Sequence, residues 1–128
     1  MFKLSSLILI SLLLSTACGN ALDISQNDNG KIINVSQGDI VAIKLAENPT
    51  TGYSWQFEIN PENQNVINVI SSKYLKQATT LIGAGGTKEY KFEVKNAGQI
   101  TISGYYVRPW EELDKNTATQ VHYTIKAQ

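Results

Sequence analysis

The chain has 128 residues, of which 42% are hydrophobic and 17% are charged. This length and composition are typical of one globular domain and exclude a disordered chain. Eleven Lys and Arg balance eleven Asp and Glu, so no basic surface for nucleic acid is indicated. We therefore expect one folded domain, a monomer, with no nucleic-acid partner.

Residues 1–17 have the pattern of a signal for export. Lys3 supplies a positive charge, an apolar run follows from Leu4 to Leu14, and small residues occupy positions 15–17. The apolar run is shorter than the roughly 20 residues that span a bilayer. A short buried helix is the alternative for this segment. We expect export of the mature protein, which would be periplasmic, anchored to a membrane or secreted.

Cys18 is the only cysteine, so no disulfide can form within the chain. Together with the Leu-rich run, Thr16-Ala17-Cys18-Gly19 resembles a bacterial lipobox, whose cysteine becomes the lipidated first residue. Ser15 departs from that pattern, because lipoboxes usually carry Leu at this position. An ordinary secretory signal, cut near Ala17 or Ala21, is the alternative. A catalytic role is disfavoured, because the thiol lies at the processing site, far from the folded region.

The rest of the chain alternates between apolar and polar residues with a period of two, which is typical of β-strands. Residues 18–30 are polar and predict a loose lead-in to a domain over 31–128. A strand is predicted over 66–72. The other predicted strands have as their inward positions Ile33 and Val35; Val41, Ile43 and Leu45; Tyr53, Trp55, Phe57 and Ile59; Tyr90, Phe92 and Val94; Ile100, Ile102, Gly104 and Tyr106; and Val121, Tyr123 and Ile125.

Turn and loop signals separate these segments. Asn96-Ala97-Gly98 predicts a short hairpin, and longer loops are predicted over 48–52, 73–86 and 108–116. With about seven to eight strands and no convincing helix, the pattern predicts an all-β, immunoglobulin-like antiparallel β-sandwich. A barrel is the alternative.

Groups for catalysis are scarce. His122 is the only histidine, and the alternation places it on the polar face of the last strand as a solvated residue. No Gly-x-Ser-x-Gly sequence supplies a nucleophile, and one His and one Cys at opposite ends of the chain cannot form a metal site. The acidic residues Glu111, Glu112 and Asp114 are expected to be solvated. We expect no enzyme activity, no metal and no cofactor.

The first predicted loop has the composition of a rigid binding element. It reads Asn48-Pro49-Thr50-Thr51-Gly52-Tyr53. Pro49 fixes its own φ, and Gly52 permits a positive φ at the return into the next strand. The two threonines between them are β-branched and have little freedom to lose on binding. A well-formed turn with incidental threonines is the alternative.

Two further loops carry unusual residues. Gly83-Ala84-Gly85-Gly86 would allow its backbone to approach another surface closely, or would be a flexible hairpin tip. Arg108-Pro109-Trp110 pairs two residue types that are enriched at binding hot spots. The alternative for Trp110 is that it folds back over the edge of the sandwich. Loops of an immunoglobulin-like sandwich gather at its ends, so these three loops are expected to form one composite edge.

In this order, the three loops resemble the motifs of the chagasin family of cysteine peptidase inhibitors, and the similarity extends over about 31–126. The resemblance implies an immunoglobulin-like sandwich that wedges three loops into the active-site cleft of papain-like cysteine proteases. Inhibition would be reversible, non-covalent and competitive. Thr50 and Thr51 would lie closest to the catalytic cysteine and histidine of the protease. The loops 83–86 and 108–110 would contact the walls of the cleft, and Trp110 would pack on an aromatic surface.

An exported immunoglobulin-like module for adhesion or carbohydrate binding is the alternative function. Such a module would be expected to carry a flat aromatic platform with Asn and Asp ligands, rather than one convex edge. An exported enzyme of unknown type is a second alternative, which the single histidine and the missing motifs disfavour.

Overall fold

The computed structural model describes residues 20–60, 64–75 and 85–128. Over these ranges the helical segments are two short 310 turns, and no helix is long and apolar enough to cross a membrane. The strands are β1 Ala21–Ser25, β2 Ile32–Val35, β3 Ile40–Glu47, β4 Ser54–Ile59, β5 Ile67–Leu75, β6 Gly86–Val94, β7 Gly98–Val107 and β8 Thr119–Ala127.

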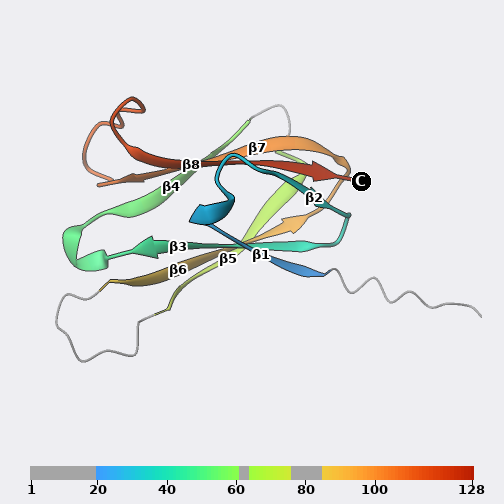
Figure 1. Ribbon diagram of the computed structural model, residues 1–128, viewed down its shortest axis with the longest axis horizontal. Coiled ribbons are helices and arrows are strands. Elements are labelled where there is room, and N and C mark those ends of the chain that lie inside the picture. The colour runs from blue at the N-terminus through green and yellow to red at the C-terminus, as the bar shows by residue number, and fades with distance from the viewer. Residues whose placement is uncertain (1–19, 61–63, 76–84) are drawn as a thin grey trace, which may run out of the picture.

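The strands form two four-stranded sheets, which lie one above the other in Figure 1. Their strand orders are β1-β3-β6-β5 and β2-β8-β7-β4. The two sheets confirm the predicted immunoglobulin-like sandwich, and the barrel alternative is wrong. The pairing is antiparallel except at two edges, where β1 runs parallel to β3 and β2 runs parallel to β8.

The core lies between the sheets, where the predicted inward positions meet. The most completely buried side chains are Tyr123, Phe92, Ile43, Leu45, Ile100, Ile102, Ile125, Val41 and Val94. Each such side chain contributes roughly 1.5–3 kcal/mol on burial. Ala42, predicted on the polar face of its strand, is also buried, at 2% exposure. The alternation therefore identified the core, although a small residue on the opposite face is covered as well.

The prediction of a loose lead-in is wrong for residues 21–28. Ala21–Ser25 form β1 beside β3, and Ile24 enters the core with 4% exposure. The Tyr123 hydroxyl donates a hydrogen bond to the Ser25 carbonyl at 2.8 Å, which ties this segment to β8. The alternation in this strand extends over only Leu22 and Ile24, and Leu22 is exposed, so the pattern was too short to be recognised.

The predicted hairpin at 96–98 is also wrong. β6 and β7 belong to different sheets, so the connection between Val94 and Gly98 crosses from one sheet to the other. A Cβ on Gly98 would lie 2.8 Å from the Val66 side chain, so this crossing passes close to the core. The strand predicted over 66–72 is β5, which continues to Leu75, and the predicted loop 73–86 is shorter at both ends.

Tyr123 makes the stability of the fold sensitive to alkaline pH. Burial raises the pKa of its hydroxyl to about 12, and the nearby Asp28 carboxylate adds to the shift. An unfolded chain releases this proton near pH 10, so between about pH 10 and 12 the folded state binds more protons than the unfolded state. The contribution of the buried Tyr123 hydroxyl to stability is fully present below about pH 10. The free energy of unfolding should fall as the pH rises from there toward about 12.

Urea unfolding at several pH values would measure this fall, with Tyr123→Phe as the comparison. Removal of the hydroxyl should lower stability at neutral pH, because the Ser25 carbonyl loses its donor. The variant should then lose less additional stability between pH 10 and 12 than the wild type does. Equal losses in both proteins would contradict this assignment.

Candidate functional site

The described parts of the three predicted loops lie at one end of the sandwich. The β3–β4 connection carries residues 48–53, the β7–β8 connection carries residues 108–118, and Gly85 immediately precedes β6. Figure 1 shows the β3–β4 and β7–β8 connections at its left, whereas the C-terminus lies at the right. Gly83 and Ala84 lie outside the described residues. We call this surface the loop edge, formed by residues 48–53, Gly85 and 108–110.

The first loop is held in shape by its own side chains. Pro49–Thr51 form a 310 turn that Asn48 caps, because its Oδ1 accepts from the Thr50 amide at 3.2 Å and from the Thr50 hydroxyl at 2.6 Å. The Thr51 hydroxyl donates to the Asn48 carbonyl at 2.7 Å. Gly52 has φ 78°, as its position predicted. The exposed turn is therefore shaped before any partner arrives.

Arg108 joins the third loop to the first. Its Nε donates a hydrogen bond to the Thr51 carbonyl at 3.3 Å, and its guanidinium lies 4.6 Å from the centre of the Tyr53 ring. The same guanidinium pairs with Glu111 at 3.3 Å. These contacts fix the two loops relative to each other.

Trp110 lies on the first loop and remains open to solvent. Its side chain is 70% exposed, yet a Cβ on Gly52 would collide with its indole ring. The tryptophan therefore packs over the glycine of the first loop, at the edge of the sandwich, and most of its surface remains exposed. Exposure of so large an apolar ring at a shaped edge is typical of a surface that binds a partner.

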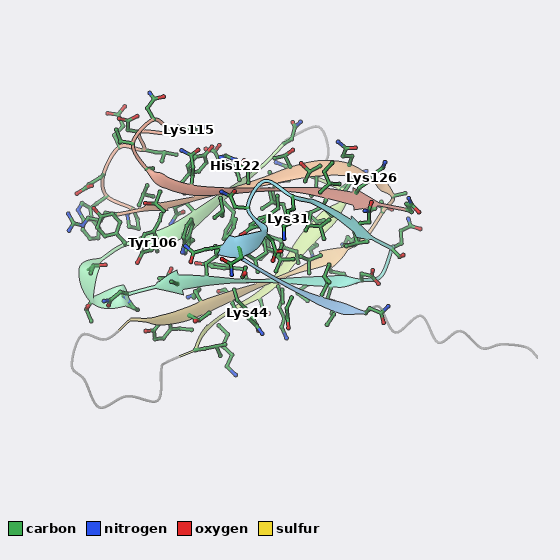
Figure 2. All side chains as sticks on the ribbon, viewed as in Figure 1. Lys31, Lys44, Tyr106, Lys115, His122 and Lys126 are labelled. Atoms are coloured by element: carbon green, nitrogen blue, oxygen red, sulfur yellow. The ribbon has the colours of Figure 1, made fainter. Side chains whose placement is uncertain are left out.

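A stack of aromatic rings supports the edge from the core side. The buried Trp55 ring stacks on Tyr106 with centroids 5.0 Å apart, and Tyr106 lies 5.3 Å from Tyr53. The Tyr106 hydroxyl accepts a hydrogen bond from the Asn48 amide at 3.0 Å. Figure 2 shows Tyr106 at the loop end of the sandwich. Tyr53, predicted as a binding residue, is half-buried and connects this stack to Arg108.

The two described glycines of the second loop differ in their surroundings. A Cβ on Gly85 would lie 3.5 Å from the Asn48 side chain, which is ordinary contact, so the second loop lies beside the first. Gly86 is instead buried as the first residue of β6. A Cβ there would meet the Tyr74 hydroxyl at 2.6 Å, so this glycine is needed for packing.

The expectation of a solvated His122 is wrong. The residue is half-buried, with Nδ1 2.8 Å from the Ser103 hydroxyl oxygen and Nε2 2.8 Å from the Gln120 side-chain oxygen. Tyr105, which is 5% exposed, packs its ring against the imidazole in a T-shaped arrangement with centroids 6.0 Å apart. A catalytic triad has its serine at Nε2 and a carboxylate at Nδ1, whereas here Ser103 is at Nδ1 and an uncharged Gln120 is at Nε2, so these three residues do not form one. In the described ranges, no group of three or more His, Cys, Asp or Glu could hold a metal.

The arrangement defines a binding protein. Its distinctive surface is one edge of preshaped loops, with an exposed aromatic anchor. A family model described as Chagasin family peptidase inhibitor I42 matches residues 34–126. The chain therefore belongs to the chagasin family of peptidase inhibitors, which confirms the resemblance in the loop sequences. The family is one of inhibitors, so the protein is an inhibitor and not an enzyme.

Individual relatives agree with this assignment. Chagasin of Trypanosoma cruzi is 37% identical over 90 residues, which cover 68% of this chain and 81% of chagasin. Amoebiasin-2 of Entamoeba histolytica is 28% identical over 101 residues, which cover 78% of this chain and 81% of the relative.

Two solved structures are similar in fold. The cysteine protease inhibitor EhICP2 from Entamoeba histolytica has a TM-score of 0.72 at 19% identity, over 85% of this chain and 96% of that chain. PbICP-C, solved in complex with falcipain-2, has a TM-score of 0.57 at 23% identity, over 86% of this chain and 91% of that chain.

Proposed function

We propose that the protein is a reversible, non-covalent, competitive inhibitor of papain-like cysteine proteases, and that its loop edge fills their active-site cleft. The interlocking of the exposed turn Pro49–Thr51 with the Arg108–Trp110 loop is the observation that carries this proposal. Family membership and a fold neighbour bound to falcipain-2 support the protease class. The alternative of a carbohydrate-binding or adhesion module receives no such support.

The geometry suits a protease cleft. The cleft is concave, so its complement must be convex and must lose little freedom on binding. The hydrogen bonds of Asn48, Thr50 and Thr51 shape the turn in advance. Trp110 provides an apolar anchor of the kind that dominates interface energetics.

Titration of the purified protein against papain tests the proposal. We expect competitive inhibition that is reversed on dilution, with the inhibitor recovered intact. Trypsin serves as the control and should retain full activity. Recovery of cleaved inhibitor only, or equal inhibition of trypsin, would contradict a non-covalent inhibitor specific for papain-like enzymes.

His122→Ala should lower the stability of the fold without changing the inhibition of papain. The substitution removes the hydrogen bonds to Ser103 and Gln120, so we expect the free energy of unfolding to fall by about 1 kcal/mol. The inhibition constant for papain should not change, because His122 lies on the outer face of a sheet, away from the loop edge in Figure 2. Urea unfolding and inhibition assays measure both quantities. A variant that is stable but inhibits poorly would place the binding surface on this sheet face.

We further propose that the protein is exported as a monomer and carries a lipid on Cys18, which lies outside the described residues. Cys18→Ser should then convert a membrane-associated protein into a soluble one, or should stall its processing. Fractionation and mass spectrometry of the mature N-terminus measure this. A wholly soluble wild-type protein with an unmodified N-terminus would support the ordinary secretory signal instead.

A further inference from the structure

Glu47 is an unusual residue at the base of the first loop. Among the described residues it is the one charged residue that is buried, with 6% exposure. It ends β3 and directly precedes Asn48. Its Oε1 accepts hydrogen bonds from the Trp55 backbone amide and from the Tyr90 hydroxyl, each at 3.2 Å. Burial of a carboxylate is unfavourable unless such bonds compensate for lost water, so the contacts point to a role for this side chain.

The two strands that flank the first loop are not paired with each other, so no ladder of backbone hydrogen bonds closes the base of the loop. It connects β3 to β4, which belong to different sheets. β4 is an edge strand, so its amides on the open side need partners outside the ladder. The Trp55 amide finds such a partner in the Glu47 carboxylate. Because Glu47 and Trp55 flank the loop, this bond closes it as a ladder bond closes a hairpin.

The neighbours of Glu47 bridge the same gap between the sheets. The Trp55 indole Nε1 donates to the Ala46 carbonyl at 2.9 Å, and the Asn48 amide donates to the Tyr106 hydroxyl at 3.0 Å. Three consecutive residues, the last two of β3 and the first of the loop, therefore bond to residues of the other sheet, and Glu47 is the central one.

Tyr90 holds the carboxylate from the sheet of β3. A tyrosine hydroxyl is a protonated donor at neutral pH, and burial, and after it the negative charge of Glu47, raises the pKa of Tyr90 further. The Tyr90 ring packs edge-on against Phe57 of β4 with centroids 4.7 Å apart. The carboxylate is thus fixed by donors from both sheets.

We propose that Glu47 is a positioning residue for inhibition. Its carboxylate fixes the base of the first loop across the two sheets, and so sets how Thr50 and Thr51 are presented to the protease. This inference rests on the proposed inhibition of papain-like proteases. Because the side chain is buried beneath the loop, its removal should weaken inhibition through loop mobility rather than through a lost contact.

The test compares Glu47→Ala, Glu47→Gln and Ile100→Ala. Papain inhibition constants and hydrogen exchange of the Trp55 amide are measured for each protein well below its thermal midpoint. Glu47→Ala should raise the inhibition constant about tenfold and should speed Trp55 exchange by a similar factor. Glu47→Gln keeps an acceptor oxygen and should stay within about threefold of wild type. Ile100→Ala truncates the core away from the loop and should leave inhibition within about twofold, although it lowers the midpoint.

Several results would overturn the proposal. They are a wild-type inhibition constant for Glu47→Ala, unchanged exchange at Trp55, or an equal loss of inhibition in Ile100→Ala. Should Glu47→Ala fail to fold, Glu47→Met fills the space without an acceptor for the Trp55 amide, and the same criteria apply to it. Failure of the wild-type protein to inhibit papain would refute the proposed function instead, and the exchange data would then decide the positioning role alone.

Discussion

Trp110→Ala should weaken inhibition of papain by about thirtyfold or more, because truncation of an aromatic anchor at an interface costs about 2 kcal/mol or more. The fold should survive, since 70% of the side chain is exposed and it lies in a loop. Inhibition constants and thermal midpoints of the variant and the wild type measure both effects.

Ile32→Ala provides a matched control. Ile32 is also a large exposed hydrophobic residue, at 63% exposure, but it lies on β2 and outside the loop edge. Its truncation should leave inhibition unchanged. If Trp110→Ala inhibits as well as wild type, or if Ile32→Ala is equally damaging, the loop edge is not the binding surface.

Gly52→Ala should damage both the loop and its neighbour. The φ of 78° is unfavourable for any residue with a Cβ, at a cost of about 1–2 kcal/mol. The new methyl would also collide with the Trp110 indole, which must then leave its place. We expect inhibition to fall about as far as in Trp110→Ala, with an added loss of stability. Inhibition assays and urea unfolding measure the two losses.

Gly38→Ala separates the effect of the positive φ from the effect of displacing the Trp110 indole. Gly38 has a similar φ of 88°, but nothing lies within 4 Å of its Cβ position. Its amide bonds to Val94, at the end of β6 opposite Gly86, so it is distant from the loop edge. The control should lose comparable stability and no inhibition.

A double-mutant cycle adds a direct test of the contact. In the Trp110→Ala background, Gly52→Ala should cost much less inhibition than in the wild type, because the ring it displaces is already absent. Fully additive losses would mean that the two loops act independently.

The sequence predicted the sandwich because most of its strands alternate between inward apolar and outward polar residues. Phe92, Ile102 and Tyr123 each lie at predicted inward positions and are fully buried. The same rule failed where the alternation was short, as in β1, where it extends over only Leu22 and Ile24. It also could not distinguish a hairpin from a crossing between sheets at 96–98, since the turn residues are alike in both.

Parts of the candidate site were visible in the sequence, and others were not. The Pro and Gly of the first loop predicted its shape, and the positive φ of Gly52 confirms that reasoning. The contact of Arg108 with Thr51 joins residues far apart in the chain, so no local pattern contained it. Glu47 did leave a signal, because it continues the inward series Val41, Ile43 and Leu45, where a charged residue is out of place.

The first strand has a consequence for how the inhibitor would meet its targets. β1 begins beside the start of β3, where the Asn20 amide bonds to Asp39 at 3.1 Å, at the end of the sandwich away from the loop edge. β7 alone, ten residues long, spans about 33 Å between the two ends. A lipid on Cys18 would therefore hold the end opposite the loop edge against the bilayer, and the loop edge would face away from the membrane. The anchored protein would bind proteases that approach from the aqueous phase. It would not reach enzymes bound close to the surface of the same membrane.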